Sequence, residues 1–250
     1  TIDLSLSLFD WAKFRRTKGA VKLHLILDHD GYLPSFAVIT EGNVSDVKVA
    51  HQLPFDPGTI VVDDRGYNDY SLFGKWTDQG VYFVTRMKTN TLYEVVKEQE
   101  IPKNCHILKD EIIRLTGTKA DEKCPHPLRR IEVYNPEKDE ILVFLTNNMK
   151  LSATTIAAIY KDRWQIEMFF KALKQNLKIK TFVGTSANAV KIQIWTALIA
   201  ILMLKYLQLS SKFAWSLSNL IALLRMNLFT HRDIWAWLDK PFEIPPVPYE

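Results

Sequence analysis

The stretch ATTIAAIYKDRWQIEMFFKALKQNLK, residues 153–178, carries two separate stripes when it is placed on a helix. At about 100° per residue, reactive side chains fall within an arc of roughly 80°: Tyr160, Arg163, Glu167, Lys171 and Lys174. A second face, about 110° further round, collects apolar side chains: Ile159, Ile166, Phe169, Phe170, Leu173 and Leu177. The apolar face predicts a helix packed on a core. The reactive stripe suits a metal-bound carboxylate beside a polyanion, which indicates nucleic-acid chemistry.

A second informative stretch lies upstream, where an apolar run at 59–62 is followed directly by DDRGY at 63–67. A compact apolar run is typical of a buried central strand, and carboxylates at the ends of such strands line the ligand crevice of α/β sheets. If the helix packs on the same sheet, Asp64 and Glu167 meet, and a divalent cation must then compensate their charges. Mg²⁺, or Mn²⁺, suits such oxygen ligands, and a pair of ions about 4 Å apart serves in-line displacement.

The bulk composition is that of a globular protein, with 250 residues, 47% hydrophobic and 24% charged. A net charge of +4 permits a nucleic-acid partner without arguing strongly for one. Two cysteines imply no disulfide framework, so a reducing cytoplasm is expected. The longest uncharged run, residues 192–204, is shorter than the roughly 20 residues of a membrane span. It predicts a buried core helix and no membrane partner.

Strand and helix patterns follow one another along the chain. Strands are predicted at 21–27, 35–39, 59–62 and 81–85, and helices at 45–52, 69–79, 153–178, 187–208 and 216–226. Short strands are also predicted at 93–97, 106–115, 129–134 and 141–146. This order predicts an α/β fold with a mixed sheet and flanking helices. The predicted parts are a first core part at 1–89, a β-rich insertion at 90–147, core helices at 148–230 and an extended C-terminal tail at 231–250.

The spacing Tyr160-x2-Arg163-x3-Glu167-x6-Lys174 resembles the Y-R-E-K signature of bacterial insertion-sequence transposases, the insertion-sequence 4 group. The DRGY stretch at 64–67 is similar to that family's second catalytic aspartate motif. Any one of these matches alone would be weak. Together, at fixed spacing on one helix and after one strand, they form a specific signal, and the likeness extends from residue 1 to about residue 209.

The resemblance implies a ribonuclease-H-like fold with a β-rich insertion before the glutamate-bearing helix. It also implies a D-D-E triad that binds Mg²⁺, or Mn²⁺, in which Asp64 is the second acid and Glu167 the third. The residues expected to bind DNA are Tyr160, Arg163, Lys174, Lys171 and Arg65. The implied activity is cut-and-paste transposition through a hairpin at the element's end. The implied partners are double-stranded DNA of the element ends and the target, bound by a homodimer at the nucleoid in the bacterial cytoplasm.

The first acid is where the sequence departs from the family pattern. The family opens with Asp followed by Ser or Thr, and Thr1-Ile2 resembles the end of that motif. The aspartate is therefore expected just upstream of Thr1, in a missing part of a longer protein. Asp3 is a weaker candidate ligand, since strand alternation can place it on the wrong face. On this expectation the fragment alone is inactive.

Other interpretations of the same residues stay open. Glu167 with Arg163 and Lys171 is also an i, i+4 ion-pair ladder of a solvated helix face, and Asp63 is an alternative to Asp64 as the ligand. Alternative functions are a non-catalytic DNA-binding remnant of a transposase and a ribonuclease-H-like structure-specific nuclease.

Cys105-His106 and Cys124-x-His126 together offer candidate ligands for a zinc site. The two pairs lack the usual ligand separation of two to four residues, so the sequence favours no zinc site.

Overall fold

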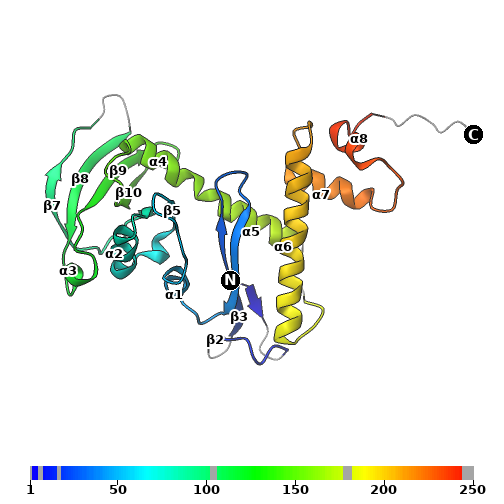
Figure 1. Ribbon diagram of the computed structural model, residues 1–250, viewed down its shortest axis with the longest axis horizontal. Helices are drawn as coiled ribbons and strands as arrows, with labels where there is room; N and C mark the ends of the chain where they lie inside the picture. The colour runs from blue at the N-terminus through cyan, green and yellow to red at the C-terminus, as the bar shows by residue number, and fades with distance from the viewer. Residues whose placement is uncertain (1, 5–7, 16–17, 102–105, 177–181, 244–250) are drawn as a thin grey trace, which may run out of the picture. The chain divides into compact units, whose positions relative to one another are not determined.

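The computed structural model describes residues 2–4, 8–15, 18–101, 106–176 and 182–243 (Figure 1). The chain divides into two compact units. We call Val44–Trp164 the continuous unit, and Thr1–Asn43 with Gln165–Glu250 the discontinuous unit. Both combine strands with helices, so the predicted α/β class is confirmed, and each unit is described by itself.

The continuous unit is built on a mixed six-stranded sheet. Its strands are β5 (Ile60–Val62), β6 (Tyr82–Arg86), β7 (Tyr93–Glu98), β8 (Ile107–Leu115), β9 (Leu128–Asn135) and β10 (Glu140–Thr146). The strand order is β5-β6-β10-β9-β8-β7, in which β5 and β6 are parallel and the other neighbours antiparallel. The four short strands predicted between residues 93 and 146 are confirmed. They extend the sheet that holds β5 and β6, and the predicted domain boundaries stay a prediction.

Two helices of this unit, α2 (Tyr70–Asp78) and α4 (Ala153–Asp162), cover opposite faces of its sheet. The unit also contains α1 (Asp46–Ala50), the 3₁₀ turn η1 (Arg65–Tyr67) and α3 (Ala120–Lys123). Phe83 stacks on Phe73 of α2 with ring centroids 4.4 Å apart. The next residue of β6, Val84, packs in the cluster that contains Ile156 of α4. Successive strand residues point to opposite faces, so α2 and α4 lie on opposite sides of β6.

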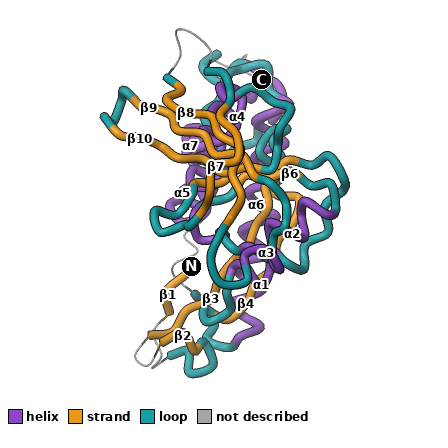
Figure 2. The backbone as a smooth tube through the Cα atoms, turned by 90° about the vertical axis from the view of Figure 1, so that its left-hand side faces the viewer, coloured by secondary structure: helices purple, strands orange, loops and turns teal. Residues whose placement is uncertain are grey.

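The discontinuous unit has a smaller antiparallel sheet covered by two helices. Its elements are β1 (Ile2–Leu4), β2 (Lys13–Arg15), β3 (Lys18–Leu27), β4 (Pro34–Glu41), α5 (Trp164–Asn176), α6 (Ala187–Ser210), α7 (Leu217–Met226) and α8 (Ile234–Asp239). Figure 2 shows β1, β2 and β4 beside β3, with which each of them pairs. Leu23 of β3, Leu173 of α5 and Ile194 of α6 share one core. Trp215 and Trp237 hold α7 and α8 in a second core.

The helix predicted at 153–178 is not continuous. It is divided at Arg163 into α4 and α5, where the Arg163 amide donates to the Tyr160 carbonyl, three residues back, at 3.1 Å. Bonds over three residues tighten a helical turn. The two halves bury their apolar faces in different cores, Ile156 in that of the continuous unit and Leu173 in that of the discontinuous unit. The apolar face predicted for one helix is therefore divided between two cores. Leu177, the last residue of that predicted face, lies outside the described residues.

The predicted core helix is α6, but only one of its faces is buried. Ile194 and Ile201 are buried, whereas Ile192 and Ile199 are exposed. The helix is 24 residues long and, by length and composition alone, apolar enough to cross a membrane, as the core helix of a soluble protein also can be.

The extended tail predicted at 231–250 is wrong for residues 234–239, which form α8. Asp233 caps this helix by accepting hydrogen bonds from the amides of Trp235 and Ala236, both at 2.9 Å. An Asp cap followed by apolar residues is a helix start signal. The neighbouring prolines directed the prediction toward extended chain instead.

Candidate active site

Asp64 stands at the carboxyl end of β5, at the start of the turn η1, and its side chain is exposed. Its Oδ1 atom accepts a hydrogen bond from the Gly66 amide at 2.6 Å. A Cβ atom on Gly66 would lie 2.8 Å from that oxygen, so a larger residue there would push the carboxylate away. Within the described part of the chain, Oδ2 of Asp64 accepts no hydrogen bond. The turn therefore orients the carboxylate through Oδ1, and Oδ2 stays available to a ligand.

Asp63 points the other way, as strand alternation requires. The Asp63 amide donates to the Val84 carbonyl at 3.2 Å, which continues the parallel pairing of β5 with β6. Its carboxyl group is buried, and among the residues described neither oxygen has a hydrogen bond of ordinary geometry, although the Thr85 hydroxyl lies near enough to affect its pKa. Burial raises the pKa of Asp63 to about 8; the Thr85 hydroxyl offsets part of this rise, and the charge of Asp64 adds to it. Of the two acids, Asp64 is the one open to an ion from solvent.

Tyr160 and Arg163, at the end of α4, belong to the continuous unit, as Asp64 does. The Tyr160 ring is buried against Phe144, with centroids 4.7 Å apart, and the Arg163 guanidinium lies 5.6 Å from its centroid. Burial raises the pKa of Tyr160, the charges of Arg163 and Arg86 lower it, and the charge of Asp64 raises it. The predicted residues Asp64, Tyr160 and Arg163 thus belong to one unit, and their joint action at a site stays a prediction.

Arg86 is a member of this group that the sequence prediction missed. It ends β6, the strand parallel to β5, and its guanidinium is 3.9 Å from the Glu140 carboxylate in a half-exposed pair. Carboxyl ends of parallel strands meet at the same edge of a sheet. Asp64 was singled out because it follows an apolar strand, and Arg86 stands at the corresponding end of the neighbouring apolar strand. The same reasoning could therefore have found Arg86.

The other predicted residues lie elsewhere. Arg65 is exposed in η1 beside Asp64. Glu167, Lys171 and Lys174 are on α5, in the discontinuous unit, and Glu167 and Lys171 are exposed there. Their stripe is separate from the buried face of α5, as predicted. Because Asp64 and Glu167 belong to different units, their convergence on one ion stays a prediction.

Asp3 lies on β1, where its backbone pairs with Ala20 of β3. Its candidacy as a ligand is untested and also stays a prediction.

Among the residues that the structure describes, no three His, Cys, Asp or Glu side chains are grouped as a metal site. The exposed Asp64 carboxylate, with one oxygen accepting no hydrogen bond, fits a hard cation such as Mg²⁺ as one ligand. The zinc alternative gains no support. Cys124 is buried in the core of the continuous unit, His126 binds Asp78 at 2.7 Å, and Cys105 lies outside the described residues.

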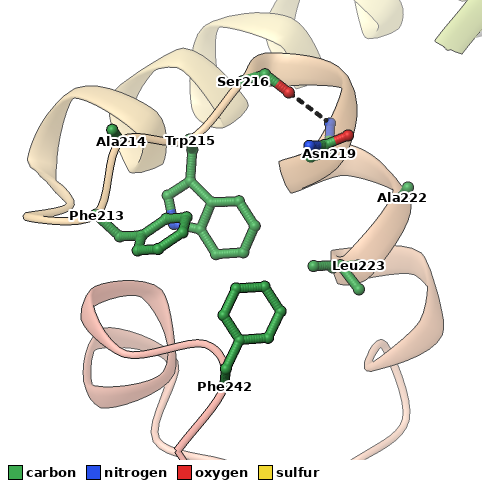
Figure 3. A pocket seen from close by; sticks show the side chains of 8 residues that line it. All are labelled: Phe213, Ala214, Trp215, Ser216, Asn219, Ala222, Leu223 and Phe242. Carbon is green, nitrogen blue, oxygen red and sulfur yellow. Dashed lines mark hydrogen bonds between the residues drawn. The ribbon is translucent and has the colours of Figure 1, made fainter.

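A separate apolar pocket of about 340 Å³ lies among the C-terminal helices of the discontinuous unit (Figure 3). Its lining residues are Phe213, Ala214, Trp215, Ser216, Asn219, Ala222, Leu223 and Phe242. None of them is titratable, and the hydroxyl of Ser216 is occupied in capping α7 through the Asn219 amide at 3.2 Å. The pocket has no group for acid–base or metal chemistry.

Comparison with known proteins gives consistent matches. A family model described as the transposase DDE domain matches residues 9–203. The chain is 34% identical to the putative transposase y4zB of Sinorhizobium fredii, over 96% of this chain and 67% of that protein. It is 30% identical to a probable transposase for insertion sequence element IS5377 of Geobacillus stearothermophilus, over 83% of this chain and 54% of that protein.

A more distant relative is the transposase InsG for insertion sequence element IS4 of Escherichia coli. It is 22% identical over 74% of this chain and 43% of that protein. The chain thus spans between 43% and 67% of the length of these relatives. The resemblance drawn from the two motifs is confirmed.

Proposed function

The chain belongs to the family of transposase DDE domains, and on that premise we propose that it cleaves DNA at insertion-sequence ends and transfers the cut strands to target DNA. The observation that carries the proposal is the exposed Asp64 carboxylate at the end of β5, in the unit that also holds Tyr160, Arg163 and Arg86. An exposed carboxylate among cations suits a metal ion that acts on a phosphodiester.

We assign Asp64 and Glu167 as ligands of Mg²⁺ or Mn²⁺, with Asp3 as a weaker candidate for the first acid. When bound, the ion neutralises phosphate charge and makes an attacking oxygen more nucleophilic. The turn at Gly66 holds Oδ1 of Asp64 and leaves Oδ2 for the ion. The assignment requires that the carboxylates of both units reach a common site.

The cations hold the DNA backbone in this proposal. Arg163 suits a bidentate contact to a phosphate, and the cation–π contact with the buried Tyr160 ring limits the freedom of its guanidinium. Arg86 adds a second guanidinium at the same edge of the sheet. The remaining proposed phosphate contacts are Lys174, Lys171, Arg65 and the hydroxyl of Tyr160. The DNA partners are double-stranded element ends and target, bound by a homodimer at the nucleoid in the bacterial cytoplasm.

The test is cleavage and joining of DNA that carries the element's own ends, by the completed protein that includes the residues upstream of Thr1, with Mn²⁺ or Mg²⁺ present. Glu167→Gln and Asp64→Asn are each expected to reduce cleavage to background while DNA binding in EDTA is retained, because each removes a metal ligand and no phosphate contact. Cleavage that survives Glu167→Gln would refute the assignment. Cleavage without joining would indicate a structure-specific nuclease. Salt-sensitive binding without cleavage would indicate a DNA-binding remnant.

A further inference from the structure

A buried hydroxyl group of the sheet contacts both ends of the loop that carries Asp64. Thr85 of β6 has no exposed surface. Its Oγ1 donates to the Asp64 carbonyl at 3.2 Å and accepts from the Asn68 side-chain amide at 3.1 Å. The same Asn68 amide donates to the Arg86 carbonyl at 3.1 Å. The first and last residues of the loop 64–68 are thereby held to the same point of β6.

We propose that Thr85 and Asn68 are positioning residues that set the direction of the Asp64 carboxylate toward its metal ion. This inference rests on the proposed function. The hydrogen bond from Gly66 to Asp64 lies within the loop, so it shapes the loop without attaching it to the sheet. Attachment comes from Thr85 and Asn68 instead, together with Lys88, whose Nζ donates to the Asn68 carbonyl at 3.1 Å.

The burial of Thr85 supports a role for its hydroxyl beyond packing. A buried hydroxyl without a partner is costly, and Val fills nearly the same volume without that cost. The two hydrogen bonds of the Thr85 hydroxyl join it to the two ends of the loop 64–68. The hydroxyl also lies near the buried Asp63 carboxyl and lowers its pKa, but the backbone that it attaches to the sheet is that of the loop. Groups that orient a metal ligand in this way typically change metal affinity or activity by about 10–100-fold when removed.

The sheet offers a matched control in Thr146 of β10, which is also fully buried. Its hydroxyl donates to the Phe83 carbonyl at 2.5 Å and accepts from the Asn148 amide at 3.0 Å. Thr146→Val thus removes a buried hydroxyl with two partners, as Thr85→Val does, but touches nothing in the loop 64–68. A difference between the two variants separates positioning of Asp64 from general loss of stability.

The experiment measures two quantities for the completed protein: the dissociation constant for Mn²⁺ without DNA, by electron paramagnetic resonance, and the Mn²⁺ concentration for half-maximal DNA cleavage. Thr85→Val is expected to raise both quantities by about tenfold. Thr85→Ser keeps the hydroxyl and is expected to give values near those of the wild type. Asn68→Ala weakens the same attachment from the loop side without altering the core, and is expected to act in the same direction. Thr146→Val is expected to leave both values at wild type, although it lowers the urea midpoint as Thr85→Val does.

Equal Mn²⁺ values for Thr85→Val and Thr146→Val would overturn the inference, as would failure of Thr85→Ser to restore binding. Asp64→Asn separates this outcome from failure of the proposed function. If Asp64→Asn binds Mn²⁺ as wild type does, Asp64 is no ligand and both proposals fail. If Asp64→Asn loses binding while Thr85→Val keeps it, only the positioning role fails.

Discussion

Replacing Arg129 tests the most deeply buried ion pair of the continuous unit. Arg129 of β9 reaches Asp110 of β8 through two hydrogen bonds, Nε to Oδ1 at 2.8 Å and Nη2 to Oδ2 at 2.6 Å. The two side chains are 7% and 3% exposed. Nη1 of Arg129 also donates to the Leu151 carbonyl at 2.5 Å, just before α4 begins. The pair therefore joins two strands to the segment that leads to Tyr160 and Arg163.

The magnitude follows from what each variant leaves behind. Arg129→Met leaves the Asp110 carboxylate buried without its partner, which costs about 3–5 kcal/mol. It also removes the donor to the Leu151 carbonyl, which costs about 1 kcal/mol more. The double variant Arg129→Met with Asp110→Val has no buried charge and is expected to cost only about 1–3 kcal/mol, from that unpaired carbonyl. The expected coupling between the two sites is therefore about 3 kcal/mol or more.

Urea unfolding gives these free energies of unfolding. Hydrogen exchange of peptides from β8 and β9 reports the loss of stability in this sheet specifically. Lys161→Ala is the control. Lys161 forms an exposed pair with Glu137 at 3.9 Å, with side chains 81% and 75% exposed, and its loss is expected to cost less than about 1 kcal/mol. The reasoning is refuted if Arg129→Met costs no more than the control, or if the double variant costs as much as the two single variants combined.

Three further outcomes are expected. Arg163→Ala is expected to lower the slope of log affinity for DNA against log salt by about one, because one phosphate contact is lost, whereas Lys161→Ala, outside the reactive stripe, leaves the slope unchanged in the same gel-shift titration. Gly74→Ala is expected to cost about 1–3 kcal/mol in thermal unfolding, because its Cβ would lie 2.1 Å from the Lys123 carbonyl. Burial raises the pKa of Asp69, but hydrogen bonds from the first turn of α2 outweigh it and hold that pKa below its ordinary value. Asp69→Ala is therefore expected to cost about 1 kcal/mol at pH 7, a cost that persists above about pH 4 and shrinks as acid protonates the wild-type carboxylate.

Local signals were sufficient for elements whose boundaries depend on their own residues. The helix predicted at 69–79 is α2, which Asp69 caps by accepting from the Leu72 amide at 3.0 Å. Gly80 follows it with a φ of 70°, a value that favours glycine after a helix. The apolar runs at 59–62 and 81–85 correctly predicted the strands β5 and β6. Only β6 is a buried inner strand, however; the prediction that the run at 59–62 is a buried central strand is wrong, because β5 ends the described sheet and Ile60 is exposed.

The division of the long helix at Arg163 could not be predicted in this way. The apolar spacing on both sides of Arg163 fits one continuous face, and no Pro or Gly interrupts residues 153–178. What divides the helix is tertiary packing, since Ile156 and Leu173 belong to different cores. Helical periodicity records which residues are buried and carries no information on which core receives them.

The choice between Asp63 and Asp64 shows how the site itself depends on register. A shift of one residue in the pairing of β5 with β6 would exchange the two acids between the interior and the surface. The hydrogen bond from the Asp63 amide to Val84 sets that register, and it leaves Asp64 exposed. The same register brings Thr85 level with the loop, where its hydroxyl meets the Asp64 carbonyl. Neither placement follows from DDRGY alone, because β5 is only three residues long and its own pattern does not favour one register over the next.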